Sequence, residues 1–170
     1  AFLSELDLPD GVELYPHQNA GIRFLMANKN CLLADDMGLG KTIQAIIGAE
    51  AVLEEGKQIL VVCPASLTQN WCNEIDQWTD RSHAILSTKS DLPTTRYVVV
   101  SYDTAKRKPL ADKLASVQWG AVICDEAHRI KNPKSGRHKL VASLKRDNVW
   151  LLTGTPMMNR PMDLFGLLRA

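Results

Sequence analysis

Hydrophobic residues along this chain gather in short runs with little polar alternation. Runs of this length, rich in valine, leucine and isoleucine, are typical of strands that are buried on both faces of a parallel sheet. The pattern predicts six strands, at residues 31–34, 58–63, 84–86, 97–101, 121–124 and 149–152.

Between the runs, hydrophobic residues recur with the period of an amphipathic helix. One stripe follows Thr42, and we expect Gly56 to stand just past the end of its helix. Its members are Ile43, Ile46, Ile47, Ala51 and Val52. A second stripe consists of Leu67, Trp71, Ile75 and Trp78. Ser66 and Gln69 have the spacing of a capping box at its start.

The alternation of strand and helix predicts an α/β fold, with a mostly parallel sheet flanked by helices on both faces. Ligands in such sheets bind at the carboxyl ends of the strands. The length of 170 residues suits a single domain covering 1–170. The chain does not begin with Met and ends inside a periodic hydrophobic stretch at 162–168, so we expect a piece of a longer polypeptide.

Composition narrows the picture only slightly. Hydrophobic residues make up 45% and charged residues 23% of the chain, and the net charge of +1 argues neither for nor against a nucleic-acid partner. The four cysteines lack zinc-ligand spacing, which predicts core thiols and a reducing compartment. The four tryptophans lie in hydrophobic patterns and are expected in the core. No hydrophobic run approaches the roughly 18 residues of a membrane helix, so we expect no membrane partner.

Residues 35–42 read Asp-Asp-Met-Gly-Leu-Gly-Lys-Thr. The tail fits the phosphate-loop pattern G-x-x-x-x-G-K-[ST], although Asp35 stands at the first glycine position. A strand, a glycine turn and a helix starting near Lys41 would direct backbone N–H groups at a phosphate. Lys41 would then reach the β and γ phosphates, while the Thr42 hydroxyl binds Mg²⁺. The alternative is an ordinary turn between strand and helix. The predicted ATP contacts of this loop are Met37, Gly38, Leu39, Gly40, Lys41 and Thr42.

A second polar motif follows the strand predicted at 121–124. Asp125 and Glu126 stand at its carboxyl end. Mg²⁺ is usually held by one or two carboxylates together with phosphates, which suits Asp125. Glu126 suits the polarising of an attacking water. The sequence therefore predicts Lys41, Asp125 and Glu126 as catalytic residues, against the alternative of a solvated acidic loop.

Three segments carry a specific resemblance: 35–42, 125–132 (Asp-Glu-Ala-His-Arg-Ile-Lys-Asn) and 152–156 (Leu-Thr-Gly-Thr-Pro). They resemble motifs of the Swi/Snf-type DNA-dependent ATPases, in superfamily two of the helicases. Similarity extends to 14–18, 62–67 and 100–103, and so to nearly the whole chain. The resemblance implies a RecA-like P-loop domain. Because an acidic pair before the loop is normal there, we infer that Asp35 and Asp36 turn from the phosphates and bond local backbone N–H groups.

The resemblance also implies roles for single residues. Gln18 would recognise adenine, with Tyr15 and His17 beside it, although Pro16 also fits a plain helix start. His128, Thr153 and Thr155 would link the nucleotide site to a DNA site, and a structural role for them is a close alternative. The predicted DNA rim consists of Pro64, Ala65, Ser66, Ser101 and Tyr102.

A basic segment supports a nucleic-acid face. Its members, with no acid among them, are Arg129, Lys131, Lys134, Arg137, Lys139, Lys145 and Arg146. A smaller cluster lies at 106–108. The predicted DNA contacts here are Lys131, Asn132, Lys134 and Arg137. A solvated helix face is the alternative.

The sequence is thus interpreted as the first ATP-binding lobe of a Swi/Snf-like translocase that uses ATP and Mg²⁺ on double-stranded DNA. The resemblance implies a second RecA-like lobe in the same polypeptide, carrying an arginine finger, so the lobe alone is expected to be inactive or very weak. The alternatives are a nucleotide-regulated binding module without turnover and a motor subunit of a restriction system. An intracellular location is expected, cytoplasmic in a prokaryotic or viral setting rather than nuclear.

Overall fold

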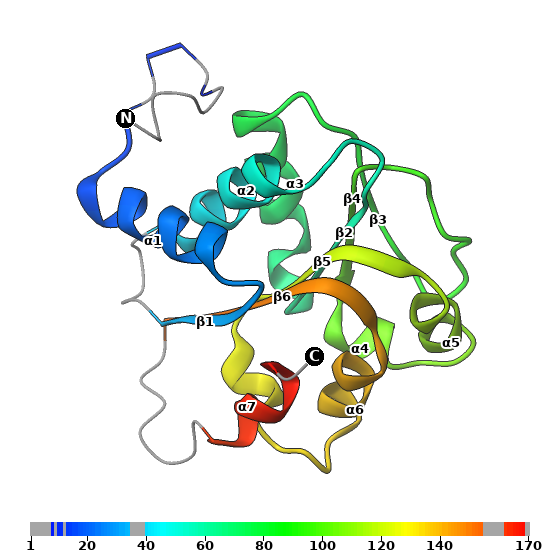
Figure 1. Cartoon of the computed structure of the whole chain (residues 1–170). Helices are drawn as coiled ribbons and strands as arrows, with labels where there is room; N and C mark the ends of the chain where they lie inside the picture. The colour runs from blue at the N-terminus through cyan, green and yellow to red at the C-terminus, as the bar shows by residue number, and fades with distance from the viewer. Residues whose placement is uncertain (1–7, 9, 12, 35–39, 155–161, 169–170) are drawn as a thin grey trace.

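A computed structural model describes residues 8, 10–11, 13–34, 40–154 and 162–168, and every structural statement refers to these residues. Six parallel strands form one sheet of order β1-β6-β5-β2-β4-β3 (Figure 1). They are β1 (Asn30–Ala34), β2 (Ile59–Cys63), β3 (His83–Ile85), β4 (Tyr97–Ser101), β5 (Gln118–Cys124) and β6 (Lys145–Thr153). All six predicted strands and the parallel α/β fold are confirmed.

Two strands begin three or four residues earlier than the hydrophobic runs predicted. β5 begins at Gln118 and β6 at Lys145, and these two residues face each other in the parallel register. Both first residues are exposed. Backbone pairing therefore extends the strands beyond their hydrophobic parts, which a pattern of buried residues does not reveal.

Helices cover both faces of the sheet (Figure 1). One face carries α1 (Pro16–Ala27), α2 (Lys41–Val52) and α3 (Thr68–Trp78). The other carries α4 (Tyr102–Ala105), α5 (Leu110–Ala115), α6 (Gly136–Ser143) and α7 (Met162–Leu168). Val61 of β2 packs in the core of the first face and Val62 in the core of the second. Because successive residues point to opposite faces, burial of both faces explains the missing polar alternation.

The predicted core is largely confirmed. Trp71, Trp119 and Trp150 are buried, whereas Trp78 is half-buried. All four cysteines are buried free thiols, and burial raises the pKa of Cys31, Cys63 and Cys124 to about 12. A thiol with so high a pKa is a poor nucleophile, in agreement with the prediction of core thiols.

Two local predictions about helix ends are wrong. α2 ends at Val52 with an extended Leu53 as its cap, so Gly56, at φ +85°, lies in the following turn, and Ala51 and Val52 are exposed. Ser66 forms no capping box, because a short 3₁₀ turn, η2 (Ala65–Leu67), precedes α3. Gln69 instead bonds Asn73 one turn further along α3.

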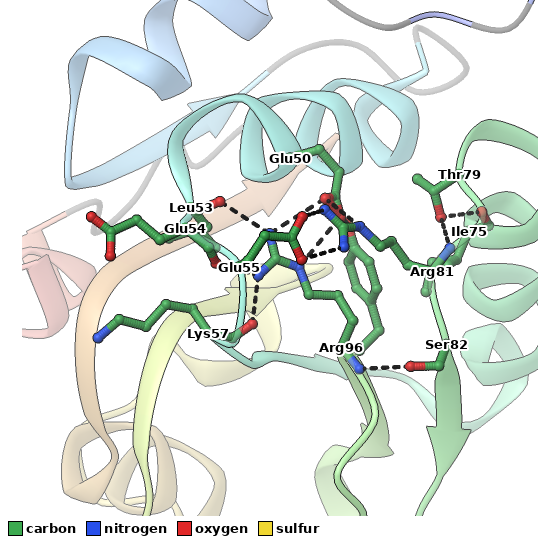
Figure 2. A network of polar contacts seen from close by, with 11 residues as sticks. Glu50, Leu53, Glu54, Glu55, Lys57, Ile75, Thr79, Arg81, Ser82 and Arg96 are labelled. Carbon is green, nitrogen blue, oxygen red and sulfur yellow. Dashed lines mark hydrogen bonds and ion pairs between the residues drawn. The ribbon is translucent and has the colours of Figure 1, made fainter.

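The carboxyl end of α2 is held by the buried guanidinium of Arg96, the residue that directly precedes β4 (Figure 2). Arg96 donates to the Glu50 carboxylate, which also accepts from Arg81 and Tyr97. The Arg96 guanidinium also donates to the carbonyl oxygens of Leu53 (3.2 Å), Glu54 (2.7 Å) and Lys57 (2.7 Å). Carbonyl groups near a helix end lack intrahelical partners, so one side chain here both caps α2 and ties it to the sheet.

We predict that Arg96→Met lowers the free energy of unfolding by about 2–4 kcal/mol, because a buried guanidinium is removed and several partly buried acceptors lose their donor at once. The matched control is Lys57→Met, which removes a half-exposed ion pair to Asp147 at 3.4 Å. Such pairs contribute about 0–1 kcal/mol. Urea unfolding of both variants measures the difference, and equal losses would contradict the assignment of Arg96 as a buried clamp.

Candidate nucleotide-binding site

The amino end of α2 carries the tail of the predicted phosphate loop. Gly40 has a left-handed backbone, φ +74°, and Lys41 is the first residue of the helix. β1 ends at Ala34, so the predicted order of strand, turn and helix is observed on both sides of 35–39. Met37, Gly38 and Leu39, together with the inferred orientation of Asp35 and Asp36, lie outside the described residues. The backbone N–H groups at the start of a helix and the helix dipole favour an anion, so this end of α2 suits a phosphate.

Asp125 follows the carboxyl end of β5 and is closely held. Its backbone N–H donates to Val62 O, and its side chain accepts from Glu126 N at Oδ1 (2.8 Å) and from Trp71 Nε1 at Oδ2 (2.9 Å). Burial raises the pKa of the Asp125 carboxyl, and the two hydrogen bonds and the charge of Lys41 oppose that rise. The carboxylate is therefore an oriented, partly desolvated charge.

Glu126 has a left-handed backbone, φ 47°, which no other non-glycine residue has in the described part of the chain. Its carboxylate forms an ion pair with Arg129, with Nε 3.2 Å from Oε2. Non-glycine residues in this conformation cluster at functional sites, because packing must offset the strain. Glu126 thus combines an unusual backbone with a paired side chain.

The amino end of α1 meets the phosphate-loop end of α2. Gln18 accepts the Tyr15 N–H at Oε1 (2.9 Å), which caps the helix. Its Nε2 lies against Gly40, where a Cβ atom would come within 2.6 Å. The rings of Tyr15 and His17 are stacked, with centroids 5.8 Å apart, and Tyr15 is 68% exposed. Pro16 is the first helical residue, so the structural and functional interpretations of this motif both fit.

These groups share one cleft of about 470 Å³. Gln18, Lys41 and Thr42 line it together with Asp125 and Glu126. Its volume lies in the range of small-molecule sites. A wall that the sequence interpretation missed comes from α3 and consists of Asn70, Glu74 and Trp78. Their spacing of four residues, which places them on one helical face, is the signal that marks this wall.

The residues predicted to couple the two sites are partly brought together. His128 Nδ1 lies 3.2 Å from Thr153 Oγ1. His128 belongs to the 3₁₀ helix η3 (Ala127–Ile130) after β5, and Thr153 is the last residue of β6. The pair therefore joins the ends of two adjacent strands. Thr155 lies outside the described residues.

The predicted DNA rim divides into an exposed part and a buried part. Ala65 and Ser66 are exposed, while Pro64 is buried. Ser101 and Tyr102 are also buried, and both side chains are used internally: Ser101 Oγ accepts Thr104 N–H, and Tyr102 Oη donates to Asp125 O at 2.6 Å. Tyr102 thus offers almost no side-chain surface to DNA in this structure.

The basic segment is not one uniform face. Arg137 pairs with Asp103 at 2.8 Å, and half-buried Arg146 donates to three carbonyl groups at the ends of α6 and α7. The interpretation of Arg146 as a phosphate-tracking residue is therefore corrected, because its guanidinium caps helices. Lys131, Lys134 and Lys139 are exposed. Asn132 is exposed and accepts the Lys134 N–H in a turn.

A phosphate-loop helix next to an Asp-Glu pair, at the carboxyl edge of a parallel sheet, defines the class of P-loop nucleotide-binding domains. The chain belongs to the SNF2-related domain family, whose sequence model matches residues 17–170. The structure is similar to the SWI2/SNF2 ATPase core of Sulfolobus solfataricus in complex with dsDNA, with a TM-score of 0.80 and 32% identity. That match covers 92% of this chain and 35% of the archaeal chain. The RecA-like fold is thereby confirmed.

Relatives come from several kingdoms. The human DNA annealing helicase and endonuclease ZRANB3 is 37% identical over 96% of this chain, and the uncharacterized ATP-dependent helicase YqhH of Bacillus subtilis is 35% identical over 82%. The chain spans 16% and 26% of their lengths. Because the relatives come from both animals and bacteria, the expected cytoplasmic location of this protein stays a prediction. In the described part of the chain, helices are too short or too polar to cross a membrane.

We predict that Gly40→Ala and Gly56→Ala each lower stability by about 1–2 kcal/mol, because alanine is strained in a left-handed conformation. Nothing lies within 4 Å of a Cβ at Gly56, whereas Gln18 meets one at Gly40. Only Gly40→Ala should therefore displace the Gln18 amide, seen as a shift of its side-chain NH₂ resonances. An unmoved Gln18 resonance in Gly40→Ala would show that the contact with Gly40 does not position this amide.

Proposed function

We propose that this chain is the ATP-binding lobe of a DNA-dependent ATPase that couples ATP hydrolysis to movement on duplex DNA. One observation carries the proposal: the start of α2, with Lys41 and Thr42, and the end of β5, with Asp125 and Glu126, line the same cleft. A cationic helix start opposite two carboxylates suits a Mg²⁺-bound polyphosphate.

The residues present fit ATP and Mg²⁺. Among the described residues, no three His, Cys, Asp or Glu side chains lie together as ligands of one metal ion. Mg²⁺ needs only one or two carboxylates, however, when phosphates supply further oxygens. Thr42 and Asp125 would hold the ion, whose charge compensates the partly desolvated carboxylate of Asp125. When bound, Mg²⁺ neutralises charge that develops on the phosphates. Lys41 would bind the β and γ phosphates.

Glu126 would accept the proton of the attacking water. The Glu126 carboxylate is paired with Arg129, so it must leave this partner, or share it, to reach a water beside the phosphate. Gln18 would bind the adenine edge through its amide, and the stacked Tyr15 and His17 would lie beside the base.

Duplex DNA is the proposed partner, as the archaeal core resembled by this chain is in complex with dsDNA. The exposed Ala65 and Ser66 at the end of β2, and the exposed Lys131 and Lys134, offer backbone amides and positive charge to phosphates. His128 and Thr153 are hydrogen-bonded to each other at the ends of β5 and β6, and would couple the cleft to the segment that begins at Lys131.

A second RecA-like lobe is part of the proposal. The chain covers 35% of the archaeal ATPase core, which leaves room there for a further lobe of similar size. In the proposed mechanism that lobe supplies an arginine finger and closes the cleft from the other side.

Two substitutions separate binding from hydrolysis in the full-length protein. Glu126→Gln should leave ATP affinity nearly unchanged and lower turnover about 10²–10⁴-fold, because an amide does not accept the proton. Lys41→Ala should instead weaken ATP binding about 10–100-fold, from the loss of a charge-assisted contact. ATP binding by calorimetry and phosphate release measure the two effects. Intact ATP binding without DNA-stimulated turnover in the wild type would favour the nucleotide-regulated binding module.

The exposed lysines give a test of the DNA face. Lys131→Ala with Lys134→Ala should weaken duplex binding for all sequences alike and flatten the log–log salt slope by about 0.9 per lost phosphate contact. Lys145→Ala serves as a control, since it is an exposed lysine at the opposite, amino end of β6. Equal slopes in the double variant and the control would make residues 131–134 a solvated surface.

If a second lobe completes the active site, residues 1–170 alone should hydrolyse ATP at least about 10³-fold more slowly than the full-length protein. The reason is that an arginine finger contributes about 10³–10⁵ in rate. A steady-state ATPase assay with saturating duplex DNA compares the two. Comparable rates would mean that the active site is complete within these residues.

A further inference from the structure

Asp125 is the meeting point of three segments that are distant in the sequence. Trp71 comes from α3, Tyr102 from the start of α4, and the acceptor Val62 O from β2. The sequence interpretation placed Trp71 in the core and Tyr102 on a DNA rim. The structure keeps Trp71 in the core, buries Tyr102, and directs the polar atoms of both side chains at the residue proposed to bind Mg²⁺.

The two donors act on different parts of Asp125. Trp71 Nε1 donates to Oδ2 at 2.9 Å, and Tyr102 Oη donates to the backbone carbonyl oxygen at 2.6 Å. The Glu126 N–H donates to the other carboxylate oxygen, Oδ1, at 2.8 Å. With one donor on each carboxylate oxygen and one on the carbonyl, neither the side chain nor the peptide group rotates freely. A carboxylate has about four acceptor sites, so lone pairs remain on it for a metal-bound water.

Burial makes these contacts costly to break. Trp71 is fully buried and Tyr102 is 2% exposed, so neither polar atom has water as a replacement partner. An indole N–H only donates, and a buried one requires an acceptor within the protein. The packing of α3 and α4 therefore sets the orientation of Asp125.

We propose that Trp71 and Tyr102 are positioning residues that hold Asp125 in the orientation required for Mg²⁺·ATP. The proposal rests on the proposed function of the cleft. Partners in the outer shell of a metal site fix the direction of its ligands, and their loss typically costs about 10–100-fold in metal affinity or activity.

The chain offers a matched control for each residue. Trp119 is equally buried and donates its Nε1–H to Leu114 O at 3.0 Å, away from the cleft. Tyr97 is buried on the same strand that leads to Tyr102, and donates its hydroxyl to Glu50 at 3.2 Å. Trp71→Phe and Trp119→Phe make the same substitution in equally buried sites. Tyr102→Phe and Tyr97→Phe likewise each remove one buried hydroxyl.

The experiment measures the Mg²⁺ concentration that gives half-maximal binding of a fluorescent ATP analogue to the full-length protein, without turnover. Trp71→Phe should raise it about tenfold or more. Tyr102→Phe should raise it in the same direction by a smaller factor of at least about threefold, since its bond reaches the backbone only. Trp119→Phe and Tyr97→Phe should stay within about twofold of wild type, even where their melting temperatures fall as far. ATPase assays should show turnover recovering at saturating Mg²⁺.

A half-saturation point in Trp71→Phe or Tyr102→Phe within the range of its control would overturn the role of that residue. If Trp71→Phe fails to fold, Tyr102→Phe still tests the proposal, because it removes only one hydroxyl oxygen and is expected to fold. Failure of the proposed function has a different signature: the wild type would then bind no nucleotide with Mg²⁺, or Lys41→Ala would bind it as tightly. A normal response to Lys41→Ala with unshifted positioning variants refutes this inference alone.

Discussion

Parallel pairing is the constraint on which the candidate site depends. Because the described strands run in one direction, the ends of β1, β5 and β6 lie at the same edge of the sheet. Lys41, the Asp125–Glu126 pair and Thr153 each follow, or end, one of these strands. β6 lies between β1 and β5, so His128 and Thr153 interact beside the cleft. An antiparallel partner in this sheet would send one of these groups to the opposite edge.

The helix that carries Lys41 is held at both ends. Arg96 and Glu50 tie its carboxyl end to β4, and Gly40 lets its amino end approach Gln18 of α1. α1 and α2 also pack closely along their length, since a Cβ atom on Gly21 would meet Gln44 at 1.7 Å. A glycine on one helix thus makes room for a buried glutamine on the other. The proposed phosphate-binding role of this helix start requires such support, because catalytic geometry tolerates little displacement.

The unfavourable free-energy terms of the site, desolvation and backbone strain, are concentrated at Asp125 and Glu126. Burial raises the pKa of the Asp125 carboxyl, so its negative charge is partly desolvated, and Glu126 occupies a strained backbone conformation. The Trp71 and Tyr102 hydrogen bonds oppose rotation of Asp125, and Arg129 pairs with Glu126. A bound cation would offset the desolvation of Asp125, which is the physical link between this carboxylate and the proposed magnesium site.

The sequence by itself determined the strands, the approximate positions of α2 and α3, and the two polar motifs of the cleft. Each of these depends on a local period or on residues that are neighbours in the chain, as in Gly40-Lys41-Thr42 and Asp125-Glu126. Only the tertiary structure decided the partners of long polar side chains. Trp71 and Asp125 are 54 positions apart, Arg96 caps a helix that ends more than 40 positions earlier, and Arg146 bonds carbonyl groups instead of a solvent-facing phosphate. Whether such a side chain faces solvent or an internal acceptor depends on how α3, α4 and α6 pack against the sheet. Residue type and spacing do not encode that choice, because the same indole, phenol or guanidinium satisfies its donors in either place.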